Sequence, residues 1–84
     1  MDLEALSGAA RTVTGTKQTA KAVANGQARH VFVARDAEER VVQPVLESCQ
    51  EKNIPVTYVD SMEELGKACN IKVKAAMAAI LTDA

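Results

Sequence analysis

The sequence is poor in aromatic residues. Its 84 residues include no tryptophan, one tyrosine and one phenylalanine, and both aromatic residues lie within apolar runs. Proteins that bind single-stranded nucleic acids without sequence preference stack the bases on several aromatic side chains. The composition therefore argues against this class of protein.

Long hydrophobic runs are also missing. No apolar stretch approaches the roughly 18 residues that a membrane-spanning helix needs. The first ten residues, MDLEALSGAA, contain two acids and no base, whereas a signal peptide begins with a basic segment. We therefore expect a protein that has no membrane partner and is located in the cytoplasm.

Cysteine and histidine are scarce. Cys49 and Cys69 lie twenty positions apart, and the single histidine, His30, has no acid or cysteine at ligand spacing. This pattern is neither a zinc motif nor a disulfide framework. We expect two reduced, partly buried thiols, as in intracellular proteins, a structural histidine, no metal site and no cofactor.

Motifs of catalysis are absent from the sequence. It contains no GxGxxG or P-loop, no nucleophile motif and no pair of histidines. We therefore predict that the protein is not an enzyme and has no catalytic residues. Its length allows one small domain, residues 1–84. An apolar fraction of 48% with 25% charged residues is ordinary for a globular protein.

The charges are unevenly distributed along the chain, although their sum is only −1. Two segments, residues 11–35 and 66–82, contain basic residues and no acid. If these segments meet in space, the protein has one positive and one negative face. The alternative is that the charges are merely solvated. The basic residues are Arg11, Lys17, Lys21, Arg29, Arg35, Lys67, Lys72 and Lys74.

The segment GTKQTAKAVANG predicts a helix with an unusual first turn. Thr16 is the expected N-cap, and Gly26 fits the left-handed residue that ends many helices. Basic side chains are unfavourable at a helix N-terminus because of the macrodipole, but they suit the arrival of an anion such as a phosphate. The basic side chains are Lys17 and Lys21, with the amide of Gln18 beside them; the alternative is that they are solvated surface.

Helices and strands are expected to alternate along the chain, which argues for a three-layer α/β/α sandwich. Apolar residues at helical spacing predict Leu3 and Leu6 inward in the first helix. Pro44 is placed in an early turn of its helix because it cannot sit in the middle, and Asp60-Ser61 caps the last helix. The expected helices are 2–9, 16–25 (with Ala20, Val23 and Ala24 inward), 38–52 and 62–68, and the expected strands are 11–14, 30–34 and 56–59.

The segment AAMAAIL, residues 75–81, is ambiguous. The propensity of alanine favours a helix. Small residues also fit a central strand that is packed between two layers of helices. The residues themselves leave both alternatives open.

Several separated motifs, in order, resemble one family. GTKQTAKAV, HVFVARDAE, NIPVTYV, EELGKACNI and KAAMAAI are similar to the L-seven-Ae family of ribosomal proteins, which are small RNA-binding domains that grip kink-turns. The resemblance extends from about Thr12 to Leu81 and looks most like small bacterial members. It implies that 75–81 is a strand, and hence an α/β/α sandwich with a four-stranded mixed sheet.

The resemblance also assigns RNA contacts residue by residue. Lys17 and Gln18 match the Asn-Glu pair that reads tandem sheared G·A pairs elsewhere in the family, so one carboxylate is lost and one cation is gained. Met62 falls near a position that is often basic. The apolar loop at 71–74 would cover flipped-out nucleotides, unless its aliphatic side chains are tucked inward. The full set is Gly15, Thr16, Lys17, Gln18, Lys21, Glu38, Val42, Ile71, Lys72, Val73 and Lys74.

The resemblance implies a non-catalytic protein that recognises and stabilises kink-turns, in which tandem G·A pairs adjoin a bulge. The expected partner is structured RNA, either ribosomal RNA or a riboswitch, and the protein is expected to be a monomer. The alternative is a ribosome-associated adaptor that never touches RNA directly. A steep fall of RNA affinity with salt would distinguish the two, because it reports phosphate neutralisation.

Overall fold

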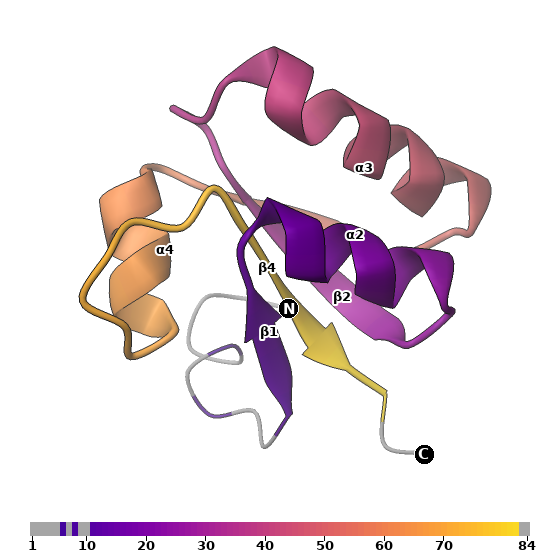
Figure 1. The fold of residues 1–84 in the computed structure, drawn as a ribbon, viewed down its shortest axis with the longest axis horizontal. Coiled ribbons are helices and arrows are strands. Elements are labelled where there is room, and N and C mark those ends of the chain that lie inside the picture. Colours follow the sequence, from indigo (N-terminus) through magenta and orange to yellow (C-terminus); the bar gives the residue numbers. More distant parts are fainter. Residues whose placement is uncertain (1–5, 7, 9–10, 83–84) are drawn as a thin grey trace.

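The computed structural model describes residues 6, 8 and 11–82, which form a sheet with helices on both faces (Figure 1). The expected helix over 2–9 lies mostly outside the described residues, but Leu6 is described and is buried as expected. The elements, in chain order, are β1 (Thr12–Thr14), α2 (Thr16–Ala24), β2 (Ala28–Ala34), α3 (Glu39–Glu51), β3 (Val56–Val59), α4 (Met62–Ala68) and β4 (Met77–Leu81).

The four strands form one mixed sheet in the order β1-β4-β2-β3. β4 pairs antiparallel with β1 and with β2, whereas β2 and β3 run parallel. The segment 75–81 is thus a strand from Met77 onward, beside the HVFVA strand, as the family resemblance implied and alanine propensity did not. Tertiary packing decides its conformation, because Met77, Ala78 and Ala79 are all fully buried.

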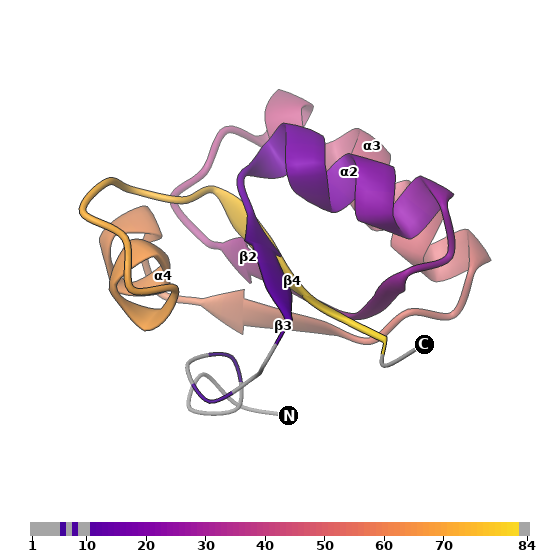
Figure 2. The ribbon, with the colours of Figure 1, turned by 60° about the horizontal axis from the view of Figure 1, so that its bottom comes forward.

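The two faces of the sheet carry separate apolar cores. α2 and α3 lie together on one face (Figure 2), where Val23 and Val45 pack against Val31 of β2. α4 covers the other face, where Leu65 packs against Phe32 together with Leu6. The expected three-layer α/β/α architecture is therefore confirmed.

The ends of α2 differ in part from the expectation. Thr16 is the first helical residue and not the N-cap; that place is taken by Gly15, which has φ +91° and offers no side-chain cap. Gly26 has φ +71°, and the N–H groups of Gly26 and Gln27 bond back to Val23 and Ala22. This is the Schellman arrangement that the glycine predicted. The expected inward position of Ala24 is wrong, because Ala24 is exposed and Thr19 is buried instead.

α3 and α4 resolve two further expectations. Pro44 lies inside α3, in its second turn, which is an early turn as expected, and the helix accommodates there a residue that cannot donate to the preceding turn. Ser61 is the N-cap of α4, as expected, and its hydroxyl accepts a hydrogen bond from the Glu64 N–H at 3.1 Å. An asparagine with positive φ follows each helix, Asn53 after α3 and Asn70 after α4. Each has the left-handed conformation that Gly26 has after α2.

The two cysteines and the histidine are buried or half-buried. Cys49 is fully buried, Cys69 is half-buried, and both are free; burial raises the pKa of both thiols. His30 Nε2 lies 2.7 Å from the Thr57 hydroxyl, and its ring packs on Phe32 with centroids 4.9 Å apart. Burial is the main cause that lowers the pKa of His30.

Candidate nucleic-acid interface

All three helices α2, α3 and α4 begin at one end of the sheet. β1, β2 and β3 end there and β4 begins there, since Thr14 pairs with Ala78 and Ala34 with Val59. Figure 1 shows the starts of α2 and α3 on the same side of the molecule as α4. We call this region the helix-start end; it comprises residues 15–18, 35–39, 60–62 and 71–76.

The first turn of α2 is open to solvent and rich in donors. The leading N–H groups of a helix have no partner within it, and no side chain caps those of α2. Lys17 and Gln18 are exposed on this turn, and Lys21 is exposed one turn further along. No acid is present in the first turn, and neither lysine forms an ion pair with a described residue. The positive potential of the helix end therefore remains uncompensated.

The loop Ile71–Lys74 lies beside this turn. The Gly15 N–H donates to the Met77 carbonyl over 2.8 Å, which places the start of α2 next to the residues that lead into β4. Val73 is 69% exposed, and Lys72 and Lys74 are also exposed. Ile71 is half-buried and packs against the α4 core. The tip of the loop thus presents one apolar side chain between two ammonium groups.

A groove runs between this loop and α4. Its wall on the helix carries Glu63 and Lys67, which form an exposed i,i+4 ion pair of 3.5 Å. The remaining lining residues are Ile71, Lys72, Val73 and Lys74. The groove therefore combines two apolar side chains with more positive than negative charge.

The remaining two predicted site residues, Glu38 and Val42, differ in accessibility. Glu38 is exposed and is the N-cap of α3; its carboxylate accepts a hydrogen bond from Arg40 Nε at 2.8 Å. Val42 is only 5% exposed and packs in the core beneath α3. The structure brings Glu38 to the helix-start end and places the side chain of Val42 in the interior.

The charge pattern of the sequence is only partly reproduced in space. Lys17, Lys72 and Lys74 belong to the helix-start end. Arg11 lies at the opposite end of the sheet, where its carbonyl accepts the Leu81 N–H. The two basic segments therefore meet in space only in part.

The charge of Arg35 does not add to the unpaired positive charge of the helix-start end. It pairs with Asp60 at 3.7 Å, and its guanidinium lies 5.3 Å from the ring centroid of Tyr58. Tyr58 is 50% exposed, so it is less enclosed than its place in an apolar run suggested.

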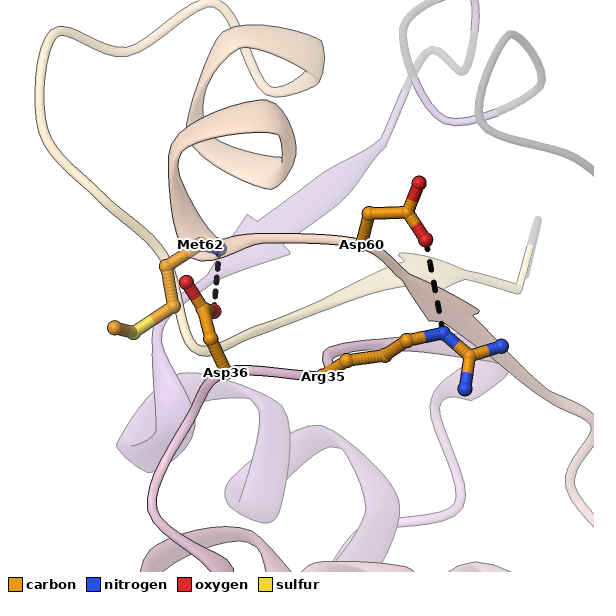
Figure 3. Close-up of polar contacts among 4 residues, drawn as sticks. All are labelled: Arg35, Asp36, Asp60 and Met62. Carbon is orange, nitrogen blue, oxygen red and sulfur yellow. Dashed lines mark hydrogen bonds and ion pairs between the residues drawn. The ribbon is translucent and has the colours of Figure 1, made fainter.

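Two residues at this end were missed in the sequence. Gly66 lies within α4, and a Cβ there would overlap the Val73 carbonyl oxygen, so the loop rests directly on the helix backbone. A glycine inside a short helix was the available signal. The Asp36 carboxylate accepts a hydrogen bond from the Met62 N–H at 2.8 Å (Figure 3). No local sequence pattern indicated that contact, which joins residues 26 positions apart.

Other kinds of site find little support in the described part of the chain. Among residues 6, 8 and 11–82, no three histidine, cysteine, aspartate or glutamate side chains are grouped so as to hold a metal ion. Across the same residues, no helix has the length and hydropathy needed to cross a membrane. The most distinctive surface is the open helix end with its adjoining lysine-flanked apolar loop.

An α/β/α sandwich that carries such a surface is typical of a small binding domain. The chain belongs to the Ribosomal protein L7Ae/L30e/S12e/Gadd45 family, whose model matches residues 2–84. This is the family that the sequence motifs resemble.

Individual relatives agree with this assignment. The chain is 49% identical over 81 residues to an RNA-binding protein of Geobacillus sp., covering 96% of this chain and 99% of the relative. It is 48% identical over 81 residues to the RNA-binding protein YbxF of Geobacillus stearothermophilus, with the same coverage. Its fold is similar to that of the 15.5kD RNA binding protein of Giardia lamblia, with a TM-score of 0.85 and 27% identity, covering 96% of this chain and 68% of that one.

Proposed function

We propose that this protein is a single-domain, non-catalytic RNA-binding protein that recognises and stabilises kink-turns. The observation that carries the proposal is the juxtaposition of the open α2 N-terminus with the Ile71–Lys74 loop, joined through the Gly15–Met77 hydrogen bond of 2.8 Å. Relatives that are named as RNA-binding proteins support the proposal that the protein binds RNA. The chemistry of the two surfaces supports the proposal that its target is a kink-turn.

The first turn of α2 is the surface that reads bases. Lysine can donate to guanine O6 and N7, and glutamine can bond adenine through both amide atoms. Lys17 and Gln18 provide these groups, and the bare backbone of Gly15 allows a close approach. Side chains cannot enter the deep, narrow major groove of regular A-form RNA. The helix therefore requires an RNA whose groove is opened, as it is beside tandem G·A pairs.

The loop is the surface that holds unstacked nucleotides. Val73 is 69% exposed, and its aliphatic side chain can make apolar contact with the flat face of a base that has left the stack. Lys72 and Lys74 flank it and can neutralise the phosphates of that nucleotide. Both surfaces can be engaged together only by an RNA that bends sharply and extrudes a base.

The other proposed contacts surround these two surfaces. Lys21 extends the basic face of α2, and Glu38 lies at the start of α3 with Arg40 as its partner. We do not include the buried side chain of Val42, which supports the packing of α3. The contacts proposed for RNA are Gly15, Thr16, Lys17, Gln18, Lys21, Glu38, Ile71, Lys72, Val73 and Lys74.

The setting of this activity is proposed from the same relatives. They come from bacteria of the genus Geobacillus, and we propose that this protein acts as a monomer in the cytoplasm of a bacterium. Its RNA would be a structured one, ribosomal RNA or a riboswitch.

Titration of two labelled RNAs tests the function. One contains a three-nucleotide bulge followed by tandem G·A pairs, and the other is a regular duplex of equal length, each with donor and acceptor dyes on its two arms. The protein is expected to bind the first RNA much more tightly and to raise its energy transfer without magnesium, because binding selects the bent state. Affinity should fall steeply with salt. Equal binding of both RNAs, or arms that stay extended, would overturn the kink-turn proposal. No binding to either would favour the adaptor alternative.

A further inference from the structure

Asp36 forms an unusual contact for a residue in the β2–α3 connection. Its Oδ1 accepts a hydrogen bond from the backbone N–H of Met62, the first residue of α4, at 2.8 Å (Figure 3). Such an N–H has no partner within its own helix. The carbonyl of Met62 in turn accepts the Ala75 N–H at 3.1 Å. Residue 62 therefore joins the segment that precedes α3 to the segment that precedes β4.

The loop Ile71–Lys74 takes its position from α4. One end is fixed where the Ile71 N–H donates to the Gly66 carbonyl at 3.1 Å, and the other where Ala75 bonds to Met62. Between these points the loop backbone touches the helix, because a Cβ on Gly66 would lie 3.4 Å from Lys74 Cα and would overlap the Val73 carbonyl oxygen. Any displacement of α4 is therefore transmitted to Val73.

Asp36 and Ser61 accept from different N–H groups of α4. Ser61 already caps the helix, through the bond from the Glu64 N–H to its hydroxyl at 3.1 Å. The neighbouring connection between the same two segments, the Arg35–Asp60 ion pair of 3.7 Å, is exposed on both sides and contributes little. The backbone bond from the Arg35 N–H to the Val59 carbonyl at 2.8 Å holds the segment before α4, and among the described residues the bond from Asp36 joins the β2–α3 connection directly to a residue of α4.

We propose that Asp36 is a positioning residue for RNA binding. Through its bond to Met62, Asp36 sets the position of the Ile71–Lys74 loop relative to the α2 N-terminus. It also sets the position of the loop relative to Glu38, which follows Asp36 by two residues. The inference rests on the proposed function, because it names a residue that acts on the same site without touching RNA.

Three variants test this role. Asp36→Ala removes the acceptor, Asp36→Asn keeps an oxygen at Oδ1, and Asp60→Asn removes an equal charge from the same end as a control. Loss of an acid favours RNA binding by electrostatics, so a weakening by Asp36→Ala occurs against that trend. We expect Asp36→Ala to lower affinity for the bulged G·A RNA about tenfold, as for one lost base contact. Asp36→Asn and Asp60→Asn should bind at least as tightly as the wild type, because each only removes a negative charge.

A coupling measurement separates positioning from a general loss of fold. Amide exchange of Met62 and Ala75 should rise in Asp36→Ala while that of Val31 in the central strand stays slow. When Val73→Ala is already present, adding Asp36→Ala should weaken binding much less than it does in the wild type.

The outcomes are distinct. If wild-type protein does not prefer the bulged G·A RNA, the proposed function fails. If it does, but Asp36→Ala binds as wild type, Asp36→Asn is no better than Asp36→Ala, or the effects of Asp36→Ala and Val73→Ala are simply additive, the positioning role is overturned.

Discussion

The N–H of Gly15 donates to the carbonyl oxygen of Met77 at 2.8 Å, joining two residues that are far apart in the sequence. Gly15 is the N-cap of α2 and Met77 is the first residue of β4. This bond brings the basic first turn of α2 beside the Val73 loop, because that loop leads directly into β4. The proposed binding surface is thus built from segments that are far apart in sequence.

Substitution of the α2 lysines should weaken RNA binding without unfolding the protein. Lys17→Ala and Lys21→Ala each remove an exposed ammonium group, and we expect a cost of about 1–3 kcal/mol in binding free energy. The free energy of unfolding should change by less than about 0.5 kcal/mol, as for other surface positions. Filter binding and thermal unfolding measure the two quantities. Lys52→Ala, at the C-terminal end of α3, is the matched control.

Gln18→Ala should change selectivity more than affinity. The amide of Gln18 is proposed to read a base edge, whereas the neighbouring lysines mainly attract phosphates. We expect the preference for tandem G·A pairs over substituted pairs to shrink, with little loss of affinity for regular duplex. Competition titrations against a panel of pair substitutions measure this ratio. If these affinity ratios are the same as for the wild type, Gln18 does not read a base and is only a solvated surface residue.

Gly66→Ala should displace the loop on α4. A methyl group at position 66 overlaps the Val73 carbonyl oxygen, and overpacking of this kind costs about 1–3 kcal/mol, more than the roughly 1 kcal/mol that alanine gains over glycine in a helix. We expect lower thermal stability and weaker RNA binding. Glu64→Ala, on the exposed side of the same helix, should cost at most about 1 kcal/mol of stability, because it removes an acid from the first turn, and it should not weaken RNA binding.

Val73→Ser should weaken RNA binding without lowering the stability of the fold, in contrast to Gly66→Ala. The side chain is 69% exposed, so its loss removes little buried apolar surface, and thermal unfolding should be unaltered. Binding of the bulged RNA should weaken, while the affinity for regular duplex stays constant. Unaltered binding of the bulged RNA would show that the loop tip does not contact a nucleotide.

The free energy of unfolding should decrease as the pH falls through about 6.5, the ordinary pKa of histidine. Burial lowers the pKa of His30 in the folded protein, so in this range the unfolded chain binds the proton more readily and is favoured by acid. Chemical denaturation between pH 8 and pH 5 measures the change. His30→Gln is the reference, because its slope retains the contribution of the carboxylates and lacks that of the imidazole.

The sequence predicts the fold where local chemistry and packing agree. Gly26 ends α2 and Ser61 caps α4 as expected, because each acts within a few residues. Residues 75–81 required the family resemblance, because burial between two helix layers overrides the propensity of alanine. The inward face of α2 differed from expectation for a related reason: Thr19 is buried and Ala24 is exposed, a rotation that depends on where α3 packs.

The candidate RNA-binding site could be predicted only in part from the sequence. The residues of the α2 turn and of the 71–74 loop were named from motifs, and the structure places them at one end of the sheet. Asp36 and Gly66 were not named, because their roles depend on contacts with Met62 and Val73 that only the folded chain makes. Val42 was named by resemblance alone, and its burial could not be deduced from its own position in the motif.

The position of β4 has a consequence for synthesis of the protein on the ribosome. β4 is the last described strand in the chain, yet it lies between β1 and β2 in the sheet. While β4 is still in the exit tunnel, β1 lacks its partner β4, and among the described strands β2 can pair only with β3. The sheet therefore closes after translation of residues 77–81, and the proposed RNA surface, which depends on the Gly15–Met77 bond, forms in the same late step. A nascent chain that ends before β4 is expected to remain unable to bind RNA.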